Sequence, residues 1–164
     1  MNLGHLVTRS ARYWPNRVAV ADRHRRLSYR QLEERSNRLA HALLGLGLNA
    51  GDRVALYSLN RSELVEAEVA LYKAGLVKAP LNARLSTEEA LHVLEDAQAR
   101  VLIVGGGYIG LEAASVASKL GLNVTLVEMG ERILQRVAAP QTSDFFRDLH
   151  RSHGVDIREG VGLE

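Results

Sequence analysis

The chain has 164 residues, of which 46% are hydrophobic and 24% charged, with a formal net charge of +2. This length and composition predict a single globular domain, since domains usually hold roughly 100–200 residues. The absence of cysteine excludes disulfides, cysteine-bound zinc and a thiol nucleophile. No apolar run approaches the roughly 18 residues of a membrane span, and no signal-peptide core begins the chain. We therefore expect a cytoplasmic protein without a membrane partner.

The charge is unevenly distributed along the chain. Residues 1–38 hold nine arginines and three acids, whereas residues 101–164 hold six basic and eight acidic residues. A basic segment of this kind could bind nucleic acid. Because the arginines lie at helix-surface spacing without interleaved aromatic residues, we interpret them as a solvated face and expect no nucleic-acid partner.

The first predicted elements are a β-hairpin and a helix. Two short β-prone runs, 18–21 and 27–29, flank a polar turn and predict the hairpin. Ser28 and Gln31 form an S-x-x-Q capping box ahead of an amphipathic helix. Gly47 is expected to end that helix.

From residue 53 onward, strands and helices alternate. The predicted strands cover residues 53–58, 76–81, 100–104, 123–128 and 155–158. Two further capping boxes are predicted ahead of helices, formed by Asn60 with Glu63 and by Ser86 with Glu89. Pro140 is placed in the first turn of the last helix. Five strands separated by helices predict a parallel sheet with right-handed crossovers and helices on both faces.

One glycine-rich motif carries recognisable chemistry. Gly105, Gly107 and Gly110 satisfy G-x-G-x-x-G between an apolar strand and a helix. In dinucleotide-binding units the first glycine allows a tight turn, the second lets the backbone approach the pyrophosphate, and the third lets the helix pack on the strand. Glu128 follows the last glycine at close to the usual spacing of about 20 for the acid that binds the adenosine ribose. The motif predicts NAD(H) binding, with NADP disfavoured by Glu128; the alternative is a glycine-rich turn without a ligand.

Other candidate residues have simpler interpretations. Glu112, in the first turn of the next helix, either favours the helix dipole or touches a ligand. His150 and His153 lie three residues apart, but no third ligand accompanies them, so both are interpreted as surface residues and no metal site is expected. Tyr13 and Trp14 are interpreted as a packing plug for the N-terminal segment. No arrangement typical of nucleophilic catalysis is present.

Residues 1–103 contain the stretches RVAVADRHRRLSYRQLEERSNRLAHALLGLGLNAGDRVALYSLN and SELVEAEVALYKAGLVKAPLNARLSTEEALHVLEDAQARVLI. They resemble the start of the adenylate-forming acyl-CoA synthetases, or AMP-dependent ligases. The resemblance implies that the family's phosphate loop, its adenylate-binding motifs and its catalytic lysine are missing. No catalytic residue is therefore expected.

Residues 101–164, which begin VLIVGGGYIGLEAASVASKLGLNVTLVE, resemble a different family. They are similar to the NAD-binding domain of FAD-dependent ferredoxin reductases, in the pyridine nucleotide-disulfide oxidoreductase superfamily. The resemblance implies that the pyrophosphate and adenosine-ribose half of the NAD(H) site is retained, on Gly105, Gly107, Tyr108, Ile109, Gly110 and Glu128, with Glu112 and Arg132 as further contacts. It also implies that the FAD domain and the nicotinamide side are missing, so no FAD is expected.

The two resemblances meet inside the strand VLIV, which implies a chimera, engineered or recombined, of two α/β fragments in one domain over 1–164. Together the fragments imply a three-layer, doubly wound, Rossmann- or flavodoxin-like sheet. Its five parallel strands are expected in the order 2-1-3-4-5, preceded by the hairpin and helix. The switch point of the sheet then falls between strands 1 and 3, above the glycine loop.

These observations predict a protein that is not an enzyme, namely a non-catalytic chimeric domain with a weakened NAD(H) site; its oligomeric state is left open. The alternative is a structural chimera without ligand or activity. A more distant alternative is acyl-CoA ligase or NADH-dependent ferredoxin reductase activity.

Overall fold

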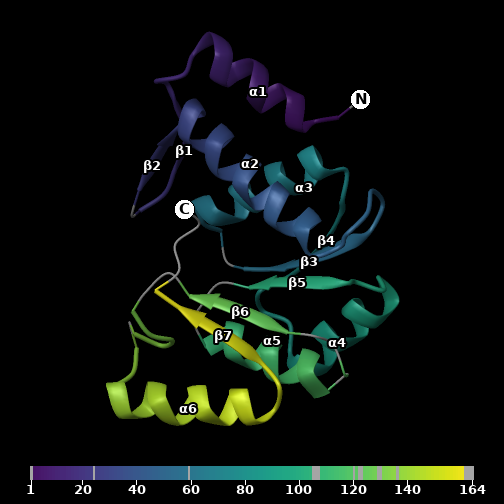
Figure 1. The fold of residues 1–164 in the computed structure, drawn as a ribbon, viewed down its shortest axis with the longest axis vertical. Coiled ribbons are helices and arrows are strands. Elements are labelled where there is room, and N and C mark those ends of the chain that lie inside the picture. Colours follow the sequence, from purple (N-terminus) through teal and green to yellow (C-terminus); the bar gives the residue numbers. More distant parts are fainter. Residues whose placement is uncertain are drawn as a thin grey trace.

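The computed structural model describes residues 2–23, 25–58, 60–104, 108–119, 121, 124–128, 131–135 and 137–160. Helices and strands alternate through most of the chain (Figure 1). In order they are α1 (Gly4–Tyr13), β1 (Val18–Ala21), β2 (Arg26–Ser28), α2 (Tyr29–Gly45), β3 (Arg53–Tyr57), α3 (Ser62–Ala74), β4 (Val77–Leu81), α4 (Thr87–Asp96), β5 (Val101–Val104), α5 (Tyr108–Lys119), β6 (Thr125–Glu128), α6 (Pro140–Ser152) and β7 (Asp156–Glu159).

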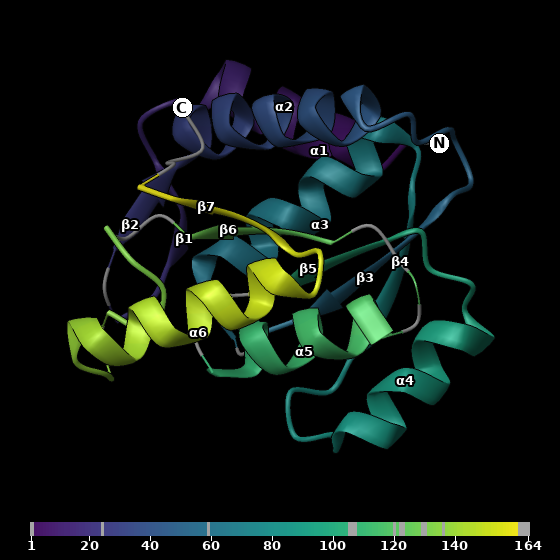
Figure 2. The ribbon, with the colours of Figure 1, turned by 60° about the horizontal axis from the view of Figure 1, so that its bottom comes forward.

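Strands β4, β3 and β5 form a parallel sheet in that order. Their residues alternate between two cores. Val54 and Leu56 pack under α2 and α3, while Ala55 and Tyr57 face α4 and α5. The helices therefore cover both faces of the sheet, as Figures 1 and 2 show. This confirms the expected α/β class with parallel strands and helices.

Strands β6 and β7 form a second parallel pair, from Thr125 opposite Asp156 to Glu128 opposite Glu159. Both views place this pair in the layer of β5 (Figures 1 and 2). The pairings among the described residues nevertheless comprise separate three-stranded and two-stranded groups. The inner order β4-β3-β5 matches the predicted 2-1-3, whereas the single five-stranded order stays a prediction.

Helix α5 packs on both groups of strands. Ala113 belongs to the core that contains Ala55 and Tyr57. Leu111 and Ala114 belong to a further core with Leu126, Ile157 and other residues beside β6, β7 and α6. Since neighbouring positions of one helix point to different sides, α5 connects the ligase-like sheet to the reductase-like pair.

Two of the three predicted capping boxes are confirmed. The Ser28 and Ser86 hydroxyls accept the backbone N–H groups of Gln31 and Glu89, and each partner side chain reaches back to its cap residue. The box predicted at Asn60 is wrong, because α3 begins at Ser62 without a side-chain cap from Arg61. Instead Asp22, in the hairpin turn, accepts the Ser62 N–H at 2.9 Å.

The N-terminal helix and the hairpin both pack against α2. The predicted hairpin is confirmed as β1 and β2, which pair antiparallel. Helix α1 packs on α2 and α3. The interpretation of Tyr13 and Trp14 as a packing plug is wrong, because they are 66% and 50% exposed. Among the described residues, no helix has the length and apolar character needed to cross a membrane.

Candidate functional site

The carboxyl ends of β3 and β5 define the first candidate site. Tyr57 and Val104 are opposite each other at these ends. Strand β4 pairs with one edge of β3 and strand β5 pairs with the other edge, so the connection from β4 to β5 crosses over β3. Open α/β sheets bind ligands at the switch point of the strand order. The position of β3 between β4 and β5 is as predicted, whereas the switch point stays a prediction; in the sequence the glycine motif follows β5 directly.

The structure describes the predicted loop only in part. Gly105 and Gly107 lie outside the described residues. Tyr108 and Ile109 form the start of α5, and Gly110 is buried in its first turn. A buried third glycine in the helix fits the role predicted for it, close packing of helix and strand.

Two acidic candidates occupy different surroundings. Glu128 is the last residue of β6 and is half-buried, at the carboxyl end of a parallel strand. Glu112 is exposed on α5, beside a narrow apolar crevice lined by Tyr57, Leu94 and Val116 among others. Glu128 is thus at the strand end where the ribose-binding acid of a dinucleotide site is expected.

Arg132 has protein partners within its own region. Its Nη1 donates to the Ser143 hydroxyl at 2.5 Å and its Nη2 to the Gln135 carbonyl at 3.5 Å. The fully buried Ser143 hydroxyl in turn donates to the Ile133 carbonyl at 2.7 Å. These bonds tie the segment before α6 to that helix. Contact between Arg132 and a dinucleotide stays a prediction.

An open groove of about 320 Å³ lies near the carboxyl ends of β3 and β4. Lys78 and Glu68 form an ion pair of 2.6 Å in its wall. The Glu68 carboxylate raises the pKa of Lys78 by accepting its hydrogen bond, although partial burial opposes the shift. Lys78 is therefore already paired, whereas Arg84, which also lines the groove, has no ion pair among the described residues.

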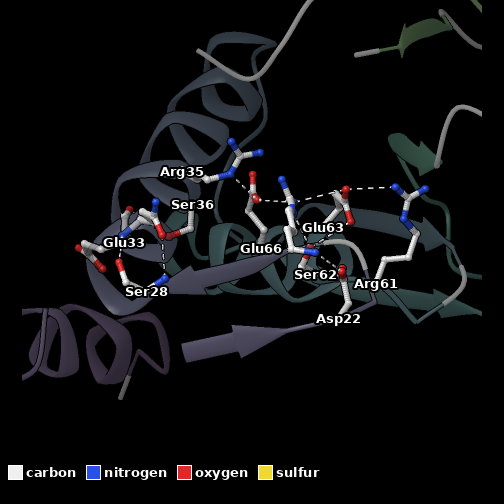
Figure 3. Close-up of polar contacts among 11 residues, drawn as sticks. Asp22, Ser28, Glu33, Arg35, Ser36, Arg61, Ser62, Glu63 and Glu66 are labelled. Carbon is white, nitrogen blue, oxygen red and sulfur yellow. Dashed lines mark hydrogen bonds and ion pairs between the residues drawn. The ribbon is translucent and has the colours of Figure 1, made fainter. Parts of the chain in front are cut away.

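A buried polar cluster, which the sequence reasoning missed, joins the hairpin to α2 and α3 (Figure 3). The Glu66 side chain is 1% exposed, and its Oε2 accepts Arg35 Nε at 2.7 Å and Arg25 Nη2 at 3.5 Å. Arg25 Nε also donates to the Ser62 hydroxyl at 2.6 Å. Among the described residues, Arg35 Nη2 and Glu66 Oε1 are buried without a hydrogen-bond partner.

The charges at the edge of this cluster also interact with one another. Glu63 lies 3.4 Å from Arg25 and 3.1 Å from Arg61. Partial burial raises the pKa of Glu63, but its own backbone N–H and the charges of the two arginines hold that pKa below its ordinary value. The Glu63 carboxylate is therefore ionised at neutral pH and stabilises the folded chain.

The cluster could not be recognised from sequence because its members come from three elements. Glu66 is one of three glutamates in α3, and Arg25 and Arg35 resemble the scattered surface arginines of the first segment. The one available signal was the position of an acid on the buried face of α3. Because Glu66 pairs with an arginine of the hairpin and an arginine of α2, the role of the cluster is positional: it holds the hairpin against the start of α3.

The interpretation of His150 as a surface residue is wrong, because only 7% of it is exposed. Its ring lies 6.5 Å from that of Phe146. Burial and the neighbouring His153 charge lower the pKa of His150. Among the described residues, no three His, Cys, Asp or Glu side chains are grouped to hold a metal ion.

The structure defines an α/β architecture in which the parallel strands β4, β3 and β5 have helices on both faces, and the sequence continues from β5 into a glycine-rich segment. The AMP-binding enzyme family model matches residues 7–152, so the chain belongs to that family. The chain is 38% identical over 103 residues to 3-oxocholest-4-en-26-oate–CoA ligase from Rhodococcus rhodochrous, covering 63% of this chain and 19% of the ligase.

The solved structures that it resembles include adenylating enzymes. The N-terminal subdomain of Klebsiella oxytoca NpsA matches with a TM-score of 0.59 and 32% identity, covering 63% of this chain and 26% of that structure. O-succinylbenzoate coenzyme A synthetase from Bacillus subtilis matches with a TM-score of 0.61 and 28% identity, covering 67% of this chain and 24% of that structure.

The second resemblance is also confirmed. A 5,5'-dehydrodivanillate O-demethylase ferredoxin reductase subunit from Sphingobium is 56% identical over 81 residues, covering 49% of this chain and 19% of the subunit. The chain thus resembles both families, and it spans about a fifth of the length of these curated relatives.

The comparisons contradict the expectation that the chain is not an enzyme. The relatives and structural neighbours of both parts are acyl-CoA ligases, adenylating enzymes and ferredoxin reductases, and the matched family is one of enzymes. The expectation was based on motifs absent from these 164 residues, whereas the segments that are present align with enzymes along much of the chain.

Proposed function

We propose that the chain is a nucleotide-binding domain that holds the adenosine diphosphate half of NAD(H) at the segment between β5 and α5. The observation that supports the proposal is that β5, an outer strand of the parallel group β4-β3-β5, ends at Val104, where the glycine-rich part of the sequence begins, and that α5 starts after three intervening residues, at Tyr108. The backbone N–H groups at the start of a helix, together with its dipole, attract phosphate. A relative from Sphingomonas, 59% identical over 59 residues, is named as a ferredoxin–NAD(P)(+) reductase.

Glu128 is proposed to select NAD(H) over NADP(H). A carboxylate at the end of the second strand accepts hydrogen bonds from the ribose hydroxyls and repels a 2′-phosphate. The position of Glu128 at the end of β6 supports this role. Gly107 is proposed to allow the close approach of the pyrophosphate, as its place in the motif indicates.

Calorimetric titration of the full chain with NADH, NADPH and AMP tests the proposal. We expect NADH to bind more tightly than NADPH, Glu128→Gln to weaken NADH binding, and Gly107→Val to abolish it. Glu95→Gln, at an exposed acid on α4, is the matched control and should leave binding unchanged. Thermal melting of each variant separates lost binding from lost folding. No NADH binding at millimolar concentration would refute the proposal.

A second candidate is ATP-dependent activation of a carboxylic acid as an acyl-adenylate. The family match over residues 7–152 favours it. Carboxylate-dependent exchange of labelled pyrophosphate into ATP would detect this reaction, and a complete lack of exchange across a panel of acyl substrates would remove it.

A further inference from the structure

Helix α1 presents apolar side chains on the side that faces away from the rest of the molecule. Leu3 and Leu6 are each 47% exposed, Tyr13 is 66% exposed and Trp14 is 50% exposed. Leu3, Leu6 and Tyr13 are spaced by three and seven residues, which places them on one helical face. We call these three residues, together with Trp14, the α1 outer face.

The opposite side of α1 is fixed to the protein. Gly4 is buried, and an added Cβ would lie 2.5 Å from Lys73 Cγ on α3. Figure 1 shows α1 at the outer end of the molecule, beyond α2, with no described element further out. The α1 outer face is therefore apolar surface that the described part of the chain leaves uncovered.

Cations accompany this apolar surface. Arg9, Arg12 and Arg17 are exposed, and none of them has a side-chain partner among the described residues. The acid of α2 nearest to this helix, Glu33, is occupied by Lys73 at 2.6 Å and by Thr8 at 3.0 Å. Glu33 therefore does not neutralise Arg9 or Arg12.

The apolar side chains exposed on α6 have different neighbours. Phe145 is 62% exposed and Leu149 is 41% exposed. The cation of that helix, Arg147, is bound by Glu159 at 2.6 Å and by Asp144 at 2.6 Å. The exposed apolar side chains of α1 therefore have unpaired arginines beside them. The arginine beside the exposed apolar side chains of α6, Arg147, is ion-paired.

We propose that the α1 outer face, with Arg9 and Arg12, is a peripheral binding surface for an anionic lipid bilayer. A helix lying in the interface inserts leucine and aromatic side chains at the boundary of headgroups and acyl chains, while arginines bind anionic headgroups. Tyr and Trp suit this depth because each has an apolar ring and a polar atom. The surface revises the expectation of no membrane partner, which considered only membrane-spanning segments.

Two other partners fit the surface less well. Nucleic acid would use the arginines but would leave the two leucines exposed, since phosphate contacts provide most of its affinity. A second copy of the chain would bring the same positive charges together. An anionic bilayer uses both the apolar and the charged groups of this face.

Trp14 is the only tryptophan of the chain, so its fluorescence reports directly on the α1 outer face. The full chain is mixed with vesicles of phosphatidylcholine alone or of phosphatidylcholine with phosphatidylglycerol, and bound protein is measured by co-sedimentation. We expect a blue shift of Trp14 emission and binding with the anionic vesicles only, and release at high salt. Arg9→Gln with Arg12→Gln should weaken binding roughly ten-fold or more.

Leu6→Ser should also reduce the blue shift, whereas Phe145→Ser on α6 is the matched control and should bind as the unaltered chain does. All these side chains are exposed, and circular dichroism checks that each variant folds. The proposal is overturned by an absence of binding to anionic vesicles or by binding that is unchanged in both α1 variants. It is also overturned if duplex DNA, titrated in parallel, binds and the vesicles do not.

Discussion

In residues 2–104 a fully buried carboxylate, Glu66, meets two arginines between the hairpin, α2 and α3. In residues 108–160 the Arg147–Glu159 pair joins α6 to β7, with both side chains partly exposed. The first arrangement specifies how several elements meet, whereas the second reinforces a contact between neighbouring elements. The two acids therefore differ in burial, since the Glu66 side chain is 1% exposed and the Glu159 side chain is 14% exposed.

The apolar cores of the two parts differ in their position relative to the strands. The sheet β4-β3-β5 has one core on each face, while β6, β7 and α6 share a separate core. Helix α5 contributes to both sides of this division, through Ala113 and Ala114. Helix α5 thus connects the core of the ligase-like part to the core of the reductase-like part. The following substitutions test this description.

Glu66→Ala should produce the largest loss of stability. It leaves the Arg35 and Arg25 cations without their buried acid, and breaking a buried pair costs about 3–5 kcal/mol. The free energy of unfolding, measured in urea, should fall by that amount. Glu68→Ala, which breaks the more exposed pair with Lys78, is the control and should cost within about 1 kcal/mol. Equal losses for the two variants would contradict the importance of burial.

Enlarging α5 should affect the two parts separately. Ala114→Leu overfills the core beside β6 and β7, and Ala113→Leu overfills the core beside β4 and α4, each at about 1–3 kcal/mol. Hydrogen exchange should increase around α6 and β7 in the first variant and around α4 and β4 in the second. The same exchange pattern in both would show that α5 does not separate the cores.

The capping residues show which features the sequence could predict. Ser28 and Ser86 cap helices through partners three residues away, so the pattern is local and visible in the sequence. The α3 cap comes from Asp22, which lies 40 residues before Ser62. The sheet order β4-β3-β5 was predictable from alternation and family resemblance, whereas the Glu66 cluster depends on contacts between elements that no local spacing shows.

Asp22→Ala should cost about 1 kcal/mol or slightly more, since it removes both the α3 cap and the bond from the Arg25 N–H. Ser86→Ala is the comparison, because it removes a purely local cap at a cost of about 1 kcal/mol. Urea unfolding measures both. If Asp22→Ala has no effect, the hairpin does not stabilise the start of α3.

Mild acid should produce the smallest loss of stability. The loss should originate in the second part of the chain, at His150 of α6. Burial lowers the pKa of His150 in the folded state, so below about pH 6.5 the unfolded state binds the proton more readily. The stability from neutral His150 is complete above that pH and declines below it. Thermal melting from pH 8 downward, to about pH 5, should show this decline.

Two variants distinguish this source of pH dependence. His150→Met should remove the decline, whereas His92→Gln, at an exposed histidine, should retain it. Burial raises the pKa of Glu159, but Arg147 and the Ile133 N–H hold it below its ordinary value of 4.5. The stability from ionised Glu159 is therefore lost only at lower pH. A decline near pH 6 that persists in His150→Met would contradict the assignment.

Hydrogen exchange of the full chain with and without NADH tests the central claim, that the segment after β5 holds the adenosine half of the dinucleotide. We predict slower exchange in peptides covering residues 105–128 and unchanged exchange in the hairpin, residues 18–28. AMP should protect the end of β6 more weakly, because it lacks the second phosphate that the start of α5 is proposed to bind. Unchanged exchange over 105–128 at millimolar NADH would contradict the account.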